Sequence, residues 1–246
     1  MSDQASTIMV NTLEPQSGTT LTVGKSGQNL QVNADSLKAN VAKDAGGNAI
    51  FTSDGSGNLS GLNSAFGSAQ TLISTTTVST AVADITITSG IDSTYKEYVF
   101  EFINIQPVTD AMAFRFQVNA VGESGYNETV TDTIFRALHK EDNTTASLSY
   151  ASGEDQAQGT SPIIIMRNIG NDADSAGVGE LHLFNPSSTT YVKNFYATTQ
   201  FYDNDSASQS DYIGGYINVT AALNAIQFTF SSGNINAGTI KMYGLK

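Results

Sequence analysis

The side chains with the clearest capacity for chemistry in this sequence are oxygen ligands set in Gly-rich runs. In GNAIFTSDGSGNLSG (47–61), Asp54, Ser56 and Asn58 stand at every second position, which is how a calcium-binding loop begins. The acidic runs at 171–180 and 203–211 offer similar ligands. All three lack the distal bidentate acid and the flanking helices of a calcium loop, and Asp-Gly is a favoured turn in β-hairpins. The sequence therefore predicts a hairpin turning at Asp54-Gly55, and no metal site.

Residues suited to acid–base or nucleophilic catalysis are sparse. The chain has two histidines and no cysteine, and it lacks the Gly-x-Ser-x-Gly sequence of a nucleophile elbow. His182 falls on the polar side of an alternating stretch, and His139 falls in a charged run. Glu97 and Glu101 flank apolar positions, where solvated rim charges explain them better than a glycosidase pair does. We therefore expect no catalytic residue, no cofactor and no enzymatic activity.

The composition restricts the partners of the 246-residue chain. Its formal net charge is −12 and only 14% of its residues are charged, whereas a nucleic-acid binder needs a basic surface that neutralises phosphates. No stretch approaches the ~18 consecutive apolar residues of a membrane span, and no basic segment followed by an apolar run marks a secretion signal. We expect no nucleic-acid partner, no membrane insertion and synthesis in the cytoplasm.

The positions of β-forming residues divide the chain into a region 1–68 and a region 69–246. The first is rich in Gly, Ser, Asn and Thr and contains short alternating pieces such as TTLTV and QNLQVN. These pieces hold too few apolar residues for a monomer core, so we predict short β-strands that share a core in a trimer. The alternative is a flexible leader. Residues 35–46 fit either a short helix or a strand.

The second region reads as an antiparallel β-sandwich. Residues 112–119 alternate Met112, Phe114, Phe116 and Val118 with polar residues, as a half-buried strand does. Residues 95–105 are apolar on both faces, which predicts a strand buried between layers. About nine such strands occur without helices between them, so we predict an all-β, jelly-roll-like fold. Residues 120–160 form a long connection suited to recognition, with room for a strand near 134–138.

Tyrosines gather late in the chain beside Asn, Asp and Gln. Tyr offers a large contact area with few rotatable bonds, which suits contact with a glycan or a protein. We predict Tyr202, Tyr212 and Tyr216 as receptor contacts. The alternative is that these residues pack the second sheet.

Several phrases resemble a known family. SGTTLTVG, GGNAIFTSDGSGNLS, YKEYVFEFINIQPVTD and the ending GTIKMYGLK are similar to short tail-fibre and virion structural proteins of tailed bacteriophages. The resemblance implies a homotrimeric component of the virion exterior, whose N-terminal segment attaches to other virion proteins and whose C-terminal sandwich faces outwards. It transfers no binding residue, because the outward loops of such proteins vary with the host.

These observations favour one function and leave two alternatives. The expected function is that of a short tail fibre or spike that binds a host-surface glycan or protein. The first alternative is a capsid decoration or head-fibre protein without receptor binding. The second is a glycan-degrading depolymerase.

Overall fold

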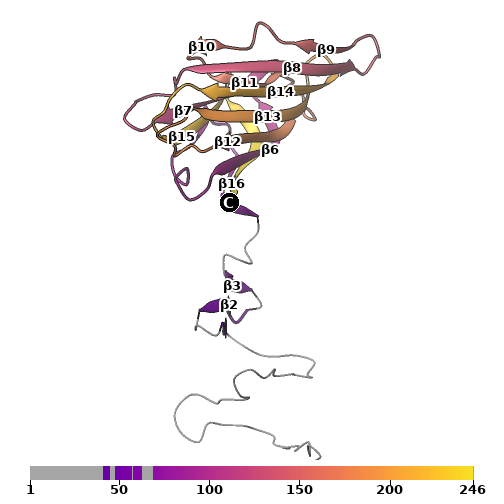
Figure 1. Cartoon of the computed structure of the whole chain (residues 1–246). Coiled ribbons are helices and arrows are strands. Elements are labelled where there is room, and N and C mark those ends of the chain that lie inside the picture. Colours follow the sequence, from indigo (N-terminus) through magenta and orange to yellow (C-terminus); the bar gives the residue numbers. More distant parts are fainter. Residues whose placement is uncertain (1–40, 45–47, 57, 63–68, 246) are drawn as a thin grey trace, which may run out of the picture. The chain divides into compact units, whose positions relative to one another are not determined.

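The computed structural model describes residues 41–44, 48–56, 58–62 and 69–245. The chain divides into two units, residues 1–66 and 67–246. Every regular element in the described residues is a β-strand, so the predicted all-β fold is confirmed (Figure 1). The described part of the chain contains no membrane-spanning helix.

The described residues of the first unit form a small antiparallel sheet in the order β1-β2-β3. Its strands are β1 (Val41–Lys43), β2 (Ala49–Ser53) and β3 (Leu59–Leu62). Strand β1 lies in the segment for which the sequence allowed a helix or a strand, and its described residues are a strand. The short strands predicted before residue 41 lie outside the described residues.

The predicted hairpin between β2 and β3 is confirmed, but its loop is longer than a two-residue Asp-Gly turn. The Asp54 amide donates to the Asn58 carbonyl at 3.1 Å. The Asp54 carboxylate accepts hydrogen bonds from the backbone amides of Ser56 (2.7 Å) and Asn58 (3.2 Å). Asp44 and Asn48 repeat this arrangement before β2, with the Asp44 amide 2.9 Å from the Asn48 carbonyl oxygen. Aspartate side chains therefore hold both loops closed.

The second unit is a sandwich of a nine-stranded and a four-stranded sheet. The large sheet has the order β10-β8-β14-β13-β12-β6-β16-β4, and β9 pairs with the same edge of β8 as β10. The small sheet has the order β11-β7-β15-β5. The strands of the large sheet are β4 (Gln70–Val78), β6 (Glu97–Pro107), β8 (Val130–Lys140), β9 (Ala146–Tyr150), β10 (Ala157–Gly159), β12 (Gly177–Phe184), β13 (Lys193–Tyr202), β14 (Ala207–Ile217) and β16 (Ile235–Leu245). Those of the small sheet are β5 (Asp84–Ile87), β7 (Met112–Ala120), β11 (Ile163–Ile169) and β15 (Leu223–Phe230).

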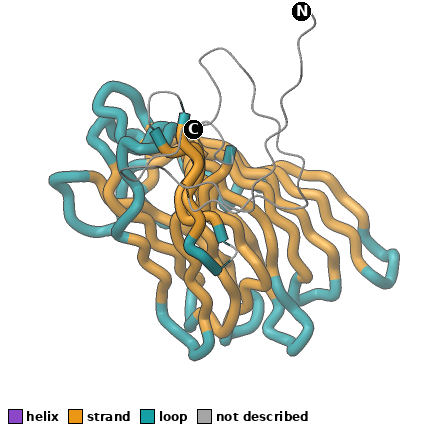
Figure 2. Tube along the Cα trace, turned by 90° about the horizontal axis from the view of Figure 1, so that it is seen from below, coloured by secondary structure: helices purple, strands orange, loops and turns teal. Residues whose placement is uncertain are grey.

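The strand order is that of a jelly roll. Four neighbouring strands of the large sheet, in the order β4-β16-β6-β12, correspond to β5-β15-β7-β11 of the small sheet. The chain changes sheet at each step from β4 to β7, and again from β11 to β12 and from β15 to β16. Strands β13, β14, β8, β9 and β10 extend the large sheet beyond this unit, and the connecting loops lie at the strand ends (Figure 2).

Aromatic side chains fill the space between the two sheets. Phe102 of β6 packs edge-on against Phe114 of β7, with ring centroids 5.5 Å apart, and also contacts Phe228 of β15. Farther along the large sheet, Phe116 packs against Phe195 of β13 at 5.2 Å. The alternation predicted for 112–119 is confirmed for Phe114, Phe116 and Val118, which are fully buried.

Two expectations about the large sheet need correction. Residues 120–160 are not mainly a connection: they hold β8, β9 and β10 as well as loops, and the strand expected near 134–138 is confirmed as part of β8. The signal for β8 was weak because this strand turns the polar residues Asp132 and Arg136 toward the sandwich interior. Strand β6 was expected to be buried on both faces. One of its faces lies in the core, and the other is partly exposed at Glu97 and Glu101. Ile105 reaches the core because the pairing shifts near Asn104, whose φ is 51°.

Candidate binding surface on the large sheet

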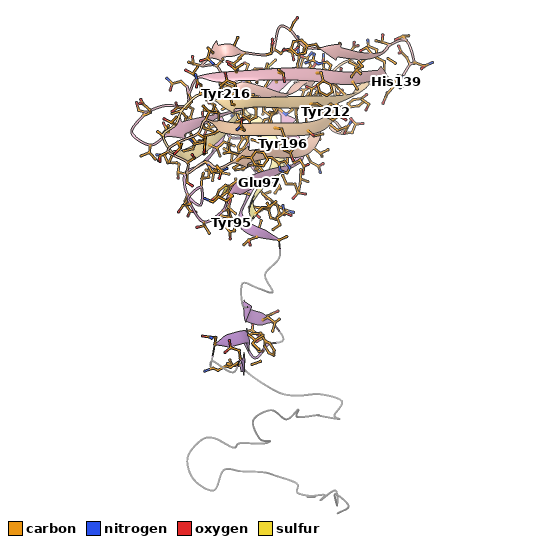
Figure 3. The ribbon with its side chains drawn as sticks, viewed as in Figure 1. Tyr95, Glu97, His139, Tyr196, Tyr212 and Tyr216 are labelled. Carbon is orange, nitrogen blue, oxygen red and sulfur yellow. The ribbon has the colours of Figure 1, made fainter. Side chains whose placement is uncertain are left out.

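The outer face of the nine-stranded sheet is the face that points away from the four-stranded sheet. Burial alternates along β13 and β14, because every second side chain enters the core and the others point outwards. Tyr196, Tyr212 and Tyr216 all project from this outer face (Figure 3). The regular strands therefore present a broad, fixed surface.

Two cross-strand ring stacks stand on the outer face. Phe135 of β8 lies opposite Tyr212 of β14, with ring centroids 4.9 Å apart and planes 9° apart. Tyr196 of β13 lies opposite His182 of β12, at 4.4 Å and 13°. Phe184 packs beside Tyr196 at 5.8 Å. We call these five residues the aromatic strip. Phe135, Tyr196 and Tyr212 are each at least 40% exposed, although large aromatic groups normally gain free energy by burial.

A depression of about 290 Å³ separates the two stacks. Gly214 forms its floor, because this residue lies between Thr133 and Tyr196 in the strand register and has no side chain. Phe135, Tyr212 and Tyr196 wall the depression, and Thr198 lies at its margin. A Cβ atom added to Gly214 would meet nothing within 4 Å. The depression is therefore open space on the sheet, bounded by aromatic rings and hydroxyl groups.

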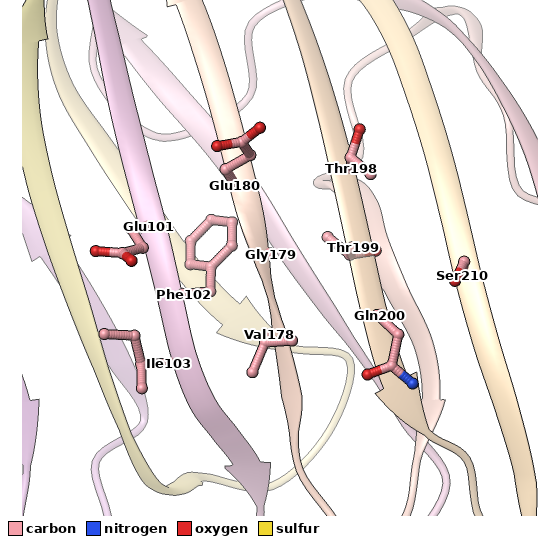
Figure 4. A pocket seen from close by; sticks show the side chains of 10 residues that line it. All are labelled: Glu101, Phe102, Ile103, Val178, Gly179, Glu180, Thr198, Thr199, Gln200 and Ser210. Carbon is pink, nitrogen blue, oxygen red and sulfur yellow. The ribbon is translucent and has the colours of Figure 1, made fainter.

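A second, larger hollow of about 490 Å³ adjoins the depression through Thr198, which lines both (Figure 4). Its lining includes Ile103 and Val178 as apolar groups and Glu101, Glu180 and Gln200 as polar groups. Residue 179 must be glycine here, because a Cβ would lie 2.5 Å from the Thr198 carbonyl oxygen. The hollow continues the candidate surface from β13 across β12 to β6.

Charged groups near the strip are mostly acidic. His182 Nδ1 lies 2.5 Å from Glu97 Oε1, and its Nε2 lies 3.4 Å from Glu180 Oε1. Burial and the neighbouring carboxylates of Glu97 and Glu180 raise the pKa of Tyr196, so its phenol is neutral at physiological pH. Glu101 lies 3.7 Å from Lys241 Nζ and accepts a hydrogen bond from the Tyr243 hydroxyl at 3.2 Å.

The structure separates the three tyrosines that the sequence suggested as receptor contacts. Tyr212 belongs to the aromatic strip. Tyr216 lies four residues farther along β14, about 13 Å away at the rise of a strand, and its hydroxyl accepts a 3.4 Å hydrogen bond from Gln158. Tyr202 lies at the end of β13, opposite Ser208. All three share the outer face, but they do not form one cluster.

Sequence reasoning missed Phe135 as a surface residue, and among the late tyrosines it did not select Tyr196 as a receptor contact. Phe135 lay in the segment interpreted mainly as a connection. The available signal was that Thr131, Thr133 and Phe135 occupy every second position. This spacing places the ring of Phe135 on the polar side of an alternating strand. Tyr196 alternates with Phe195 and Ala197, which are buried. An aromatic residue in phase with polar ones marks a surface position.

Two of the three runs considered as calcium sites, 47–61 and 203–211, use their carboxylates for local structure. The Asn58 side chain, with the Ser56 and Asn58 amides, lowers the pKa of the Asp54 carboxyl. Asp203 accepts hydrogen bonds from the Asp205 and Ala207 amides at 2.9 and 2.8 Å. Asp211 is buried beside Arg136. No group of three or more potential metal ligands occurs among the described residues.

The fold and the surface together define an all-β, jelly-roll-like sandwich with an aromatic outer face. No family model, no curated protein and no solved structure matches the chain.

Proposed function

We propose that this protein is a bacteriophage virion structural protein of the short tail-fibre or spike type. Its N-terminal segment attaches to other virion proteins, and its C-terminal sandwich binds a receptor on the host surface. The sequence segments that resemble tail-fibre proteins are the basis for the proposed class of protein. The outer face of the nine-stranded sheet provides a surface suited to binding.

The aromatic strip is the observation that carries the receptor-binding proposal. Adjacent exposed rings on regular strands provide a rigid apolar contact area, and little side-chain freedom is lost when a ligand covers them. Contiguous exposed apolar groups of this kind are characteristic of interaction sites. A purely structural decoration protein has no comparable need for exposed rings on the open face of a sheet.

The three-stranded sheet of the first unit supports the proposal of a homotrimer. A sheet of three short strands needs an apolar face packed against something else to be stable. Phe51 and Ile50 of β2 are only partly covered within the described residues. Copies of the same chain around a threefold axis would complete the core.

Two measurements test this function on the full chain. Light scattering should give three times the chain mass of 25.9 kDa. Purified protein added to host cells should reduce adsorption of the phage, because it occupies the same receptor. Particles that lose the protein, remain intact and adsorb poorly would support the fibre. Particles that disintegrate while the survivors adsorb normally would instead favour a decoration protein.

A further inference from the structure

We propose that the Gly214 depression is a subsite for one pyranose ring of an uncharged glycan, and that the chain continues across Thr198 into the hollow beside Val178. This inference rests on the proposed receptor-binding function and names its ligand class.

The walls of the depression match the two kinds of surface of a sugar ring. The C–H bonds on one face of a pyranose carry partial positive charge, and the negative face of an aromatic ring attracts them. Tyr196 presents such a ring opposite Gly214 on β13, and Tyr212 presents one two residues away on β14. Thr133 and Thr198 also line the depression. The Thr133 hydroxyl donates a 3.2 Å hydrogen bond to the Gly214 carbonyl oxygen, which leaves its lone pairs free to accept from a sugar hydroxyl. A lining of rings and hydroxyls suits a sugar better than it suits an apolar protein side chain.

The neighbouring charges select an uncharged glycan. Glu97, Glu101 and Glu180 project from the same outer face, with Lys241 and His182 beside them. The whole chain has a formal net charge of −12. An anionic polysaccharide would therefore be repelled over the Debye length of about 8 Å at physiological salt, whereas a neutral polymer would not.

The two hollows together define a path across the strands. Thr198 borders both of them, and the path leads from β14 over β13 and β12 to β6. Neighbouring strands are spaced about 4.8 Å apart, so the path is roughly 14 Å long. Gln200, Glu180 and Ser210 line its second part with polar groups for sugar hydroxyls. The ligand is thus a chain of several sugars rather than a single monosaccharide.

Binding of the full-length protein to immobilised neutral polysaccharides (dextran, mannan and galactan) tests the subsite, with polygalacturonate as the anionic contrast. We expect binding to at least one neutral polymer and none to polygalacturonate. Gly214→Val should weaken that binding at least tenfold, because the new side chain fills the depression. Valine suits a strand, and a Cβ at residue 214 meets nothing within 4 Å, so we expect the fold to persist. Ala146→Val is the matched control, since it places a valine on the same outer face of the sheet, on β9 and outside both hollows.

The outcomes separate the subsite from the proposed function. Neutral-polymer binding that is unchanged in Gly214→Val would overturn the subsite. So would failure to bind any of the three neutral polymers, or a preference for polygalacturonate. Host cells provide the second arm. Binding that survives periodate oxidation of the cells and is lost after protease treatment would overturn the glycan ligand while the receptor-binding function stands. A protein that neither binds host cells nor reduces phage adsorption would contradict the proposed function itself.

Discussion

Lys193 is a fully buried cation whose hydrogen-bond partners among the described residues are neutral carbonyl groups. Its ammonium donates to the carbonyl oxygens of Tyr191 (2.9 Å), Val219 (3.1 Å) and Thr220 (3.2 Å). Burial lowers its pKa. The three carbonyls belong to the loop before β13 and the loop after β14, so one side chain joins two connections at the same end of the sheet.

Lys193→Met should destabilise the sandwich by about 1–3 kcal/mol, because three carbonyl oxygens in partly buried surroundings lose their donor. Urea unfolding provides the measurement. Lys140→Met is the control: Lys140 forms a partly exposed ion pair with Asp205, and loss of such a pair costs at most about 1 kcal/mol. Equal urea midpoints for Lys193→Met and the wild type would refute the role of this lysine.

Asp132 is a buried carboxyl whose ionised form destabilises the fold. Burial, together with the charge of Asp155, raises its pKa to about 6. Its Oδ1 accepts a hydrogen bond from the Gln156 amide at 3.0 Å, while Oδ2 is buried without a hydrogen-bond partner. Because the folded pKa lies above the ordinary value of 3.8 for an aspartate, the folded state binds this proton more tightly than the unfolded state does.

Asp132→Asn should therefore raise the free energy of unfolding at pH 8 by roughly 2–3 kcal/mol. The amide oxygen keeps the acceptor for Gln156, and no charge remains buried. The advantage of the variant should shrink as the pH falls from about 6 toward 4, where wild-type Asp132 becomes protonated. Urea unfolding of both proteins at pH 5, 6 and 8 measures this, and a constant difference across the three pH values would contradict it.

At the scale of elements, β14 shows how one strand serves two surfaces through adjacent glycines. Gly214 faces outwards and leaves the depression open, whereas Gly215 faces inwards beneath the ring of Phe195. A Cβ at residue 215 would lie 2.6 Å from the Thr131 carbonyl oxygen and 2.8 Å from Phe195 Cζ. The two glycines thus have different reasons to lack a side chain.

Gly215→Ala should cost about 1–3 kcal/mol of stability through overpacking. Gly214→Ala should be neutral or stabilising by about 0.5 kcal/mol, because it restricts the unfolded chain without meeting any neighbour. Thermal and urea unfolding of the two variants compares them directly. Similar losses in both would show that the outer face at Gly214 is covered and that the depression is closed.

Sequence periodicity predicted the elements whose two faces differ in polarity and missed those whose inner face is polar. Phe114 and Phe116 alternate with polar residues, so β7 was evident. Strand β8 was not, because Asp132 and Arg136 lie on its inner side. There Arg136 pairs with Glu154 and Asp211, and Asp132 accepts a hydrogen bond from the Gln156 amide. The aromatic strip shares this limit. Tyr212 was found from composition. Its stack on Phe135, however, depends on the pairing of two residues that lie 77 positions apart in the sequence, which local spacing does not encode.

At the scale of the whole molecule, the two units have different sources of stability. The sandwich buries a continuous core that includes Phe100, Phe102, Phe114 and Phe228. The described residues of the first unit offer little apolar surface, and aspartate side chains close their loops. The sandwich should therefore fold on the strength of its own core, while the first unit depends on other copies of the chain.

Phe51→Asp should convert the proposed trimer to monomer while the unfolding temperature of the sandwich stays within about 2 °C of the wild type. Phe51 lies in the middle strand of the three-stranded sheet of the first unit, opposite Ala42 and Leu62. A carboxylate there would place three like charges in the shared core. Ser56→Asp adds the same charge to an exposed loop of this unit and should leave the trimer intact. Light scattering at micromolar concentration and calorimetry read the two properties separately. A Phe51→Asp protein that remains trimeric would place the contact between copies outside the three-stranded sheet of the first unit. A monomeric wild type would remove the trimer from the proposal altogether.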